Sequence, residues 1–245
     1  MMLSCRNVGK KFRRYEQGES LKRYFVRRLR GEVAREEWNV LSGVNLDVRP
    51  GERVAVIGRN GCGKSTLLKL MAGIYAPTTG TVTVGPGRVL ALIELGVGFY
   101  PDLTGRQNMR LNWALNGLPL AELRSRFESI AEFSGVEEFL DTPLKYYSSG
   151  MSARLGFALA MHARPELLIV DEVLAVGDLE FQQKCHARIE SLCSAGATLI
   201  LVSHNLGDVS RVCRRGVWIN GGTVAFDGPV EEAVALYTRS LQDAP

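Results

Sequence analysis

The feature that most constrains this 245-residue chain is a glycine-rich loop between an apolar run and an amphipathic run. Residues 54–57 (VAVI) are typical of a buried strand, and residues 67–72 (LLKLMA) of a helix. The loop fits the phosphate-binding template of a glycine, any four residues and then Gly-Lys-Ser/Thr. Its residues are Gly58, Arg59, Asn60, Gly61, Cys62, Gly63, Lys64, Ser65 and Thr66. Strand, loop and helix in this order indicate a site for a nucleoside triphosphate.

The chemistry of phosphate explains the residues of this loop. Glycines let the backbone curl so that its N–H groups turn inward, toward an anion. The following helix adds the positive end of its dipole. We therefore expect Lys64 to reach the β- and γ-phosphates and the Ser65 hydroxyl to hold Mg²⁺.

Two acids follow a second apolar run. Residues 167–170 (LLIV) lead directly into Asp171 and Glu172. A carboxylate at the end of a core strand needs a compensating cation, because burying an unpaired charge is costly. A nucleotide-bound Mg²⁺ would compensate Asp171. Glu172 is then the candidate general base that takes a proton from the attacking water.

Two further segments are candidate parts of the site. Residues 198–202 form another apolar run that leads into His204, at the strand end where ligands of α/β sheets bind. We expect His204 to contact the γ-phosphate. Small residues also precede an apolar helix at 152–163 and are typical of an anion site, although a serine-rich helix cap has the same pattern. They are Ser148, Ser149 and Gly150, followed by Met151.

Composition and charge limit the function classes. Hydrophobic residues make up 46% and charged residues 23%, as in ordinary globular proteins, and no apolar stretch approaches the roughly 18 residues of a membrane span. The five cysteines lack the Cys-x-x-Cys spacing of metal and redox sites, which favours free thiols. Residues 10–35 hold ten Lys or Arg and three Glu, against a net charge of +4 for the chain. Because the basic residues are concentrated in one segment, we expect that segment to bind an anionic partner, and we do not expect the chain to bind nucleic acid.

The order of elements predicts an α/β fold. Alternating strands and helices favour a largely parallel sheet. Strands are expected at 3–12, 44–48, 54–57, 81–84, 89–93, 167–170, 198–202, 217–219 and 223–226. Helices are expected at 67–72, 108–115, 121–133, 152–163, 181–195, 207–212 and 230–241. Apolar residues at helical spacing among the basic ones also predict an amphipathic helix in an insert at 16–37.

The phosphate loop, the small-residue helix start, the Asp-Glu pair and the histidine, in this order, resemble the ATP-binding subunit of ABC transporters. The resemblance implies a P-loop NTPase of ABC type: a mixed, mainly parallel sheet core, a helical subdomain and an N-terminal antiparallel β region. One domain would span 1–245, with its core at 1–94 and 164–245 and the helical subdomain at 95–163.

The resemblance also implies how the site is completed. In that family two subunits face head to tail, and each ATP lies between the phosphate loop of one and the signature segment of the other. The segment 148–151 would then act in trans. Asp178 would contact the partner subunit, and Phe12 would stack on adenine, with Tyr15 as the alternative.

Three runs resemble the exporters of O-antigen, capsular polysaccharide and teichoic acid: LIELGVGFYPDLTGRQN at 92–108, YSSGM at 147–151 and VDEVLAVGD at 170–178. The usual signature glutamine is replaced by Met151. Glu94 stands nearest to the usual Mg²⁺-contacting glutamine, and whether it takes over that contact stays open.

The resemblance implies an ATPase that powers export of a lipid-linked polysaccharide through a separate membrane permease. It implies a homodimer with ATP and Mg²⁺, bound peripherally at the cytoplasmic face of the inner membrane, with the basic insert near the permease. One alternative is another exporter of this type, for teichoic acid, capsule or a small lipid or drug. A soluble ABC ATPase and a nucleotide-binding regulator without hydrolysis are further alternatives.

Overall fold

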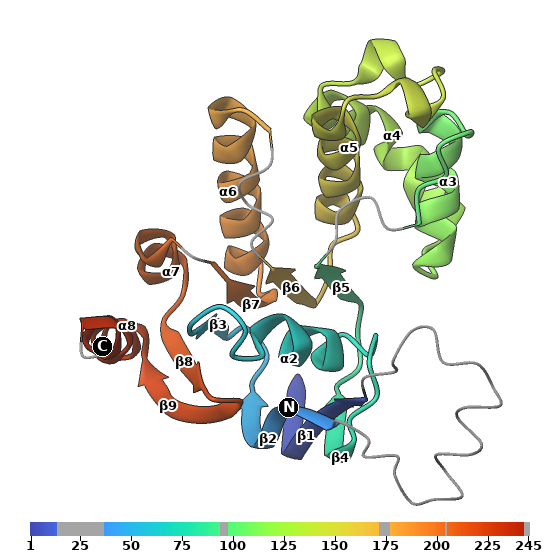
Figure 1. The fold of residues 1–245 in the computed structure, drawn as a ribbon. Helices are drawn as coiled ribbons and strands as arrows, with labels where there is room; N and C mark the ends of the chain where they lie inside the picture. The colour runs from blue at the N-terminus through green and yellow to red at the C-terminus, as the bar shows by residue number, and fades with distance from the viewer. Residues whose placement is uncertain (14–36, 94–97, 172–176, 204, 243–245) are drawn as a thin grey trace, which may run out of the picture.

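Two β-sheets pack around a common hydrophobic core in the computed structural model (Figure 1). The structure describes residues 1–13, 37–93, 98–171, 177–203 and 205–242. The smaller sheet is antiparallel, with the order β2-β1-β4. Its strands are β1 (Leu3–Arg13), β2 (Glu37–Val48) and β4 (Thr79–Val84). The larger sheet has the order β5-β6-β7-β3-β8-β9. Its strands are β5 (Val89–Leu92), β6 (Leu167–Asp171), β7 (Thr198–Val202), β3 (Arg53–Ile57), β8 (Arg215–Asn220) and β9 (Thr223–Pro229).

The larger sheet is parallel except at its β8–β9 edge, which is the expected hairpin. This confirms the predicted mixed, mainly parallel sheet with an antiparallel β region. The central strands are buried on both faces: in β3, for example, Val54 and Val56 face one core while Ala55 and Ile57 face the other. Burial on both faces explains the continuous apolar runs in the sequence.

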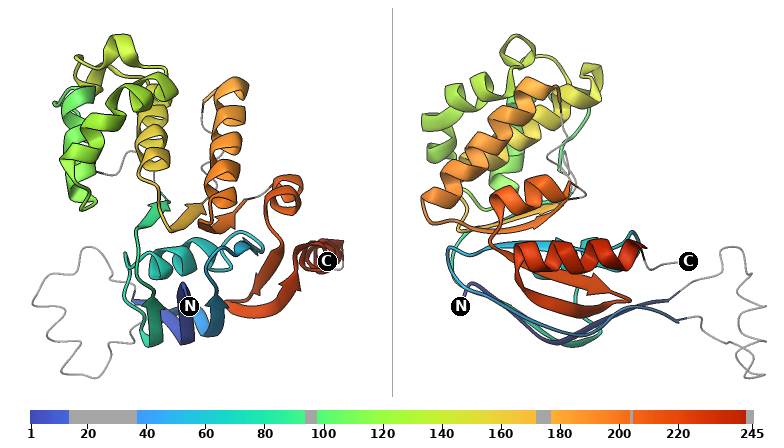
Figure 2. Two further views of the ribbon diagram at one scale, coloured as in Figure 1. Left: turned by 180° about the vertical axis from the view of Figure 1, so that it is seen from behind. Right: turned by 90° about the vertical axis from the view of Figure 1, so that its left-hand side faces the viewer.

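Helix α2 (Lys64–Met71) lies between the two sheets (Figures 1 and 2). Its buried residues share one core with residues of β1, β2, β3 and β8. The core on the other face of the larger sheet includes residues of α6 (Leu179–Ser194), α7 (Leu206–Val212), α8 (Val230–Gln242) and the second half of α5 (Ser149–His162). The phosphate loop is therefore held between the sheets, at the start of α2.

A third core belongs to a group of helices, α3 (Gly105–Leu115), α4 (Leu120–Ser134) and α5 (Ser149–His162). The short 3₁₀ turns η1 (Glu137–Phe139) and η2 (Leu144–Tyr146) join α4 to α5. Trp113 is buried here, and its indole N–H donates to the Pro119 carbonyl at 3.0 Å. No helix of the described residues is both long and apolar enough to cross a membrane.

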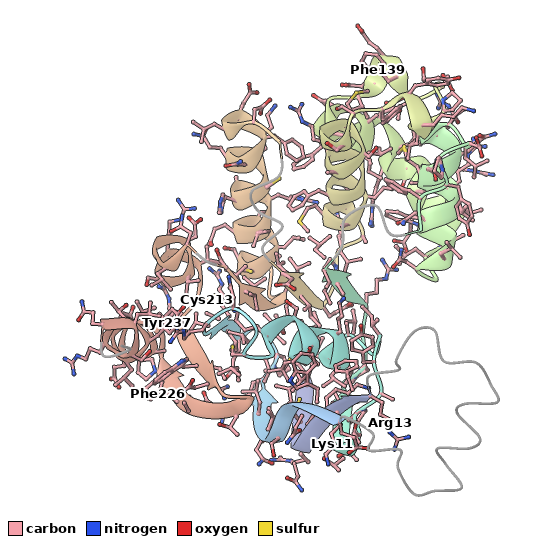
Figure 3. All side chains as sticks on the ribbon, viewed as in Figure 1. Lys11, Arg13, Phe139, Cys213, Phe226 and Tyr237 are labelled. Atoms are coloured by element: carbon pink, nitrogen blue, oxygen red, sulfur yellow. The ribbon has the colours of Figure 1, made fainter. Side chains whose placement is uncertain are left out.

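Strand β2 begins at Glu37, well before the expected residue 44. The first residues of β2 pair with the last residues of β1: Phe12 lies opposite Trp38, and Arg13 lies opposite Glu37. Cross-strand ion pairs join Glu37 to Lys11 (3.6 Å) and Arg13 (3.2 Å); Lys11 and Arg13 are labelled in Figure 3. Residues 37–39, 42 and 43 are exposed and Leu41 is the one buried residue among 37–43, so this part of the edge strand has no continuous apolar run. Residues 14–36, and with them almost the whole expected insert, lie outside the described residues.

The end of α5 makes fold stability depend on pH. His162 is buried, its Nδ1–H donates to the Ala158 carbonyl at 2.7 Å, and its Nε2 lies 3.0 Å from the Ser129 hydroxyl. A carbonyl only accepts, so Nδ1 carries a proton, and in the neutral ring Nε2 accepts from the Ser129 hydroxyl. Burial, with help from nearby arginines including Arg188, lowers the pKa of His162 below its usual 6.5.

We expect the free energy of unfolding to decrease as pH falls below about 6.5, because the unfolded chain then binds a proton that the folded chain excludes. The loss continues down to the folded-state pKa of His162. Thermal unfolding between pH 7.5 and 5.5 measures it, and His162→Gln should show a smaller decrease over that range. An equal decrease in the variant would assign the effect to other groups.

Candidate functional site

The phosphate loop joins β3 to α2 and leaves no room for side chains at two of its glycines. Gly58 has φ 152° and lies against the carbonyl oxygen of Ile219 in β8, where a Cβ atom would collide. Gly63 has φ 106°, and a Cβ there would lie 2.7 Å from Leu41 Cδ2 of β2. Both sheets therefore press on the loop, and this close approach needs glycine.

Lys64 is 7% exposed and folds back over its own loop. Its Nζ donates to the carbonyl oxygens of Gly58 at 2.8 Å and Arg59 at 3.0 Å. The ammonium group is thus held at the loop where an anion would bind. The next loop residue, Ser65, is exposed at the first turn of α2.

The other loop residues differ in exposure. Arg59, Asn60 and Gly61 are exposed, and Thr66 is half-buried. Burial raises the pKa of the half-buried Cys62 thiol, which therefore stays protonated at neutral pH.

Asp171, the first acid of the pair, is the last residue of β6. In the parallel register Asp171 lies beside Val202 at the end of β7, and β7 lies next to β3, which leads into the loop. Asp171 and the loop therefore emerge at the same edge of the sheet, where ligands of such sheets bind. Glu172 and His204 follow these strands in sequence but lie outside the described residues, as does Glu94.

The oxygen donors at this edge suit a hard divalent cation. Ser65 offers a hydroxyl and Asp171 a carboxylate, and Mg²⁺ prefers one or two protein oxygens together with substrate phosphates. Over the described ranges, no cluster of three or more His, Cys, Asp or Glu side chains could hold a metal. The Ser65 hydroxyl and the Asp171 carboxylate therefore fit a Mg²⁺ whose other ligands come from nucleotide phosphates and water.

The small-residue segment is a helix cap in this structure. Ser148 is the N-cap of α5, and its hydroxyl accepts from the backbone N–H of Met151 at 3.1 Å. Ser148 and Ser149 are exposed, and Gly150 and Met151 are half-buried. The segment begins a helix of the third core, whereas the phosphate loop lies between the two sheets (Figure 1). Loop and segment are therefore carried by different parts of the fold.

Asp178 is the N-cap of α6. Its Oδ1 accepts from the Phe181 backbone N–H at 2.9 Å, and its Oδ2 accepts from Arg154 Nη2 at 2.6 Å. The Phe181 hydrogen bond, with a further contribution from Arg154, holds the pKa of this carboxyl below its usual value. Sequence reasoning missed Arg154, which lies three residues after Met151 on α5, because a pair between two helices leaves no periodic signal.

Phe12 takes part in an aromatic and cationic cluster. Its ring centroid lies 5.6 Å from that of Tyr75, edge to face, and Lys10 Nζ lies 5.1 Å from the Phe12 centroid. Its cross-strand neighbour Trp38 is 72% exposed. Phe12 is thus half-buried against Tyr75, and the alternative Tyr15 lies outside the described residues.

A mainly parallel sheet with a phosphate loop and an acidic strand end at one edge defines a P-loop protein of the α/β class. The chain belongs to the ABC transporter family, whose sequence pattern it matches over residues 41–175.

Two kinds of exporter subunit are among its relatives. The chain is 48% identical over 201 residues to the O-antigen export system ATP-binding protein RfbB of Klebsiella pneumoniae, covering 82% of this chain and 81% of the relative. It is 43% identical over 242 residues to the protein of the same name from Myxococcus xanthus, covering 96% of this chain but 55% of the relative. It is 38% identical over 237 residues to the teichoic acids export ATP-binding protein TagH of Lactiplantibacillus plantarum, covering 97% of this chain and 64% of the relative.

Solved structures share the fold. A dimeric post-hydrolysis state of the ATP-binding cassette MJ0796, bound to ADP and Pi, superposes with a TM-score of 0.73 at 21% identity, covering 94% of this chain and 99% of that one. The ATP-binding subunit of an ABC transporter gives a TM-score of 0.72 at 23% identity, covering 100% of this chain and 95% of that one. These structures support the predicted ABC-type fold.

Proposed function

We propose that this chain is the ATP-hydrolysing subunit of an ABC exporter that moves a lipid-linked polysaccharide across the cytoplasmic membrane through a separate permease. The observation that carries the proposal is that the phosphate loop and Asp171 both lie at the carboxyl ends of parallel strands, on the same side of the sheet. The three relatives described above are named as export ATP-binding proteins, which supports the choice of class.

Each residue of the proposed site would have a separate role in ATP hydrolysis. The loop N–H groups and Lys64 would bind and orient the β- and γ-phosphates. Ser65 and Asp171 would hold Mg²⁺, which when bound neutralises phosphate charge. Glu172 would take a proton from the water whose oxygen attacks the γ-phosphorus, while the bond to the ADP oxygen breaks. His204 would contact the γ-phosphate.

A second copy of the chain would complete the site. Ser148 and Ser149 present exposed hydroxyls at the start of α5, on a different part of the fold from the loop. We propose that these residues, with Gly150 and Met151, bind the nucleotide held by the partner's loop, and that Asp178 contacts the same partner. Phe12 would stack on adenine beside Tyr75.

The cargo is proposed from the relatives. Identity to an O-antigen export protein is 48%, against 38% to a teichoic acid export protein, which favours O-antigen or a similar glycan. The subunit would bind peripherally to the permease at the cytoplasmic face of the membrane. Teichoic acid export is the second candidate.

The function is tested in two steps. The purified chain should release phosphate from ATP in the presence of Mg²⁺. A cell that lacks the chain should keep its lipid-linked glycan inside, and the intact gene should restore surface display. Absence of hydrolysis, with or without the permease, would contradict the ATPase assignment; normal surface glycan without the chain would contradict the cargo.

A further inference from the structure

Arg154 joins α5 to the start of α6 within one protomer. Its Nη2 donates to Asp178 Oδ2 at 2.6 Å, and its guanidinium carbon lies 5.4 Å from the centre of the Phe181 ring. The other Asp178 oxygen accepts from the Phe181 backbone N–H. One carboxylate thus caps α6 and holds a side chain of the helix that begins with the small-residue segment.

The backbone before Asp178 fits closely into this contact. Gly177 has φ 77°, a conformation that favours glycine. A Cβ atom there would lie 3.1 Å from Phe181 Cδ1 and 3.3 Å from Arg154 Nε. A side chain at residue 177 would therefore press against both Phe181 and Arg154, so the turn before Asp178 favours glycine.

The two helices are also held together by contacts that do not involve Arg154. The Phe157 and Phe181 rings pack edge to face with centroids 6.0 Å apart, and both rings are buried. Arg188 of α6 donates to the Met161 carbonyl through Nε at 3.3 Å and Nη2 at 3.2 Å. Loss of Arg154 should therefore leave α5 packed on α6 and release only the first residues of α6.

We propose that Arg154 is a positioning residue for the nucleotide site: it fixes Asp178 relative to segment 148–151, so that both meet the second copy in one geometry. The proposal rests on the proposed function and adds a link within one protomer between its two expected intersubunit contacts. The Asp178 side chain is 61% exposed, and exposed ion pairs add little to stability. The pair therefore matters for geometry more than for folding.

The test is a double-mutant cycle on the full chain. Arg154→Met removes the guanidinium, and Asp178→Asn keeps an Oδ1 acceptor for the α6 cap while it removes the charge. Each should lower kcat for ATP hydrolysis by about tenfold to a hundredfold, because misplacing a site component by about 1 Å has effects of this size. KM for ATP and the Tm should change little, since neither residue contacts the nucleotide bound in its own protomer.

The double variant should be no slower than the slower single variant, because both changes break one contact. Arg154→Lys should recover part of the activity. As a matched control, Arg106→Met breaks a 2.9 Å pair with Asp141, which is another arginine–aspartate pair, and should leave kcat unchanged.

Three results would overturn the proposal: unchanged kcat in either single variant, additive losses in the double variant, or a large decrease in Tm, which would make the pair structural. Each assumes a wild-type chain that hydrolyses ATP. An inactive wild-type chain would instead remove the proposed function, so the two failures are distinguishable.

Discussion

Glu172→Gln is expected to bind ATP normally but to hydrolyse it about 10²–10⁴ times more slowly, the usual contribution of a general base. Glutamine has nearly the same shape as glutamate but cannot accept the proton of the attacking water. The loop and Lys64, which bind the phosphates, are unchanged. Phosphate release and equilibrium binding of ATP, measured on the same preparation, give both quantities.

Glu180→Gln is the matched control, because Glu180 lies exposed in the first turn of α6. It should keep the wild-type rate. Robust hydrolysis by the Glu172→Gln chain would remove Glu172 from the role of base and would leave proton transfer to another group at the same sheet edge.

Lys64→Ala is expected to weaken ATP binding by at least about tenfold, since hydrogen bonds to charged groups contribute roughly 1.5–3 kcal/mol each. In the free chain the buried Lys64 ammonium donates to the Gly58 and Arg59 carbonyls. Phosphate oxygens would attract this ammonium more strongly than neutral carbonyls do, because the hydrogen bond then joins opposite charges. Titration with a fluorescent ATP analogue measures the change.

Lys145→Ala serves as the control for Lys64, since Lys145 is an exposed lysine of η2 that pairs with Asp102 in the turn before α3. Its ATP affinity should match that of the wild-type chain. Equal affinity in the Lys64→Ala chain would contradict the assignment of this loop as the phosphate site.

The central strands could be predicted from sequence because both of their faces are buried. Residues 54–57, 167–170 and 198–202 are continuous apolar runs, and the structure places strands over each of them. The phosphate loop could be recognised for a related reason. A side chain at Gly58 would collide with the carbonyl of Ile219, and one at Gly63 would collide with Leu41. The close packing therefore requires glycine at these positions, and the glycines can be seen in the sequence.

The early start of β2 could not be predicted. Its first residues are held by pairing with β1 and by ion pairs of Glu37, and neither leaves an apolar pattern. The α5–α6 link was missed for a similar reason. Arg154 and Asp178 lie 24 residues apart on different helices, and only the fold brings them to 2.6 Å.

The start of α5 illustrates a pattern with two interpretations. The sequence allowed both a serine cap and an anion site at Ser148, and the structure shows the cap. Its hydroxyl is nevertheless exposed, as is Ser149. A capped helix start that faces solvent keeps its remaining N–H groups available, so the cap is compatible with an anion supplied by a second copy.

The central claim is that one chain holds half of a nucleotide site. Sedimentation velocity of the Glu172→Gln chain, with and without Mg²⁺-ATP, tests it most directly, because this variant should hold ATP without hydrolysing it. We predict a monomer without nucleotide and a dimer with it, and no dimer when Ser148→Arg is added. A chain that stays monomeric at saturating, bound ATP would contradict the account.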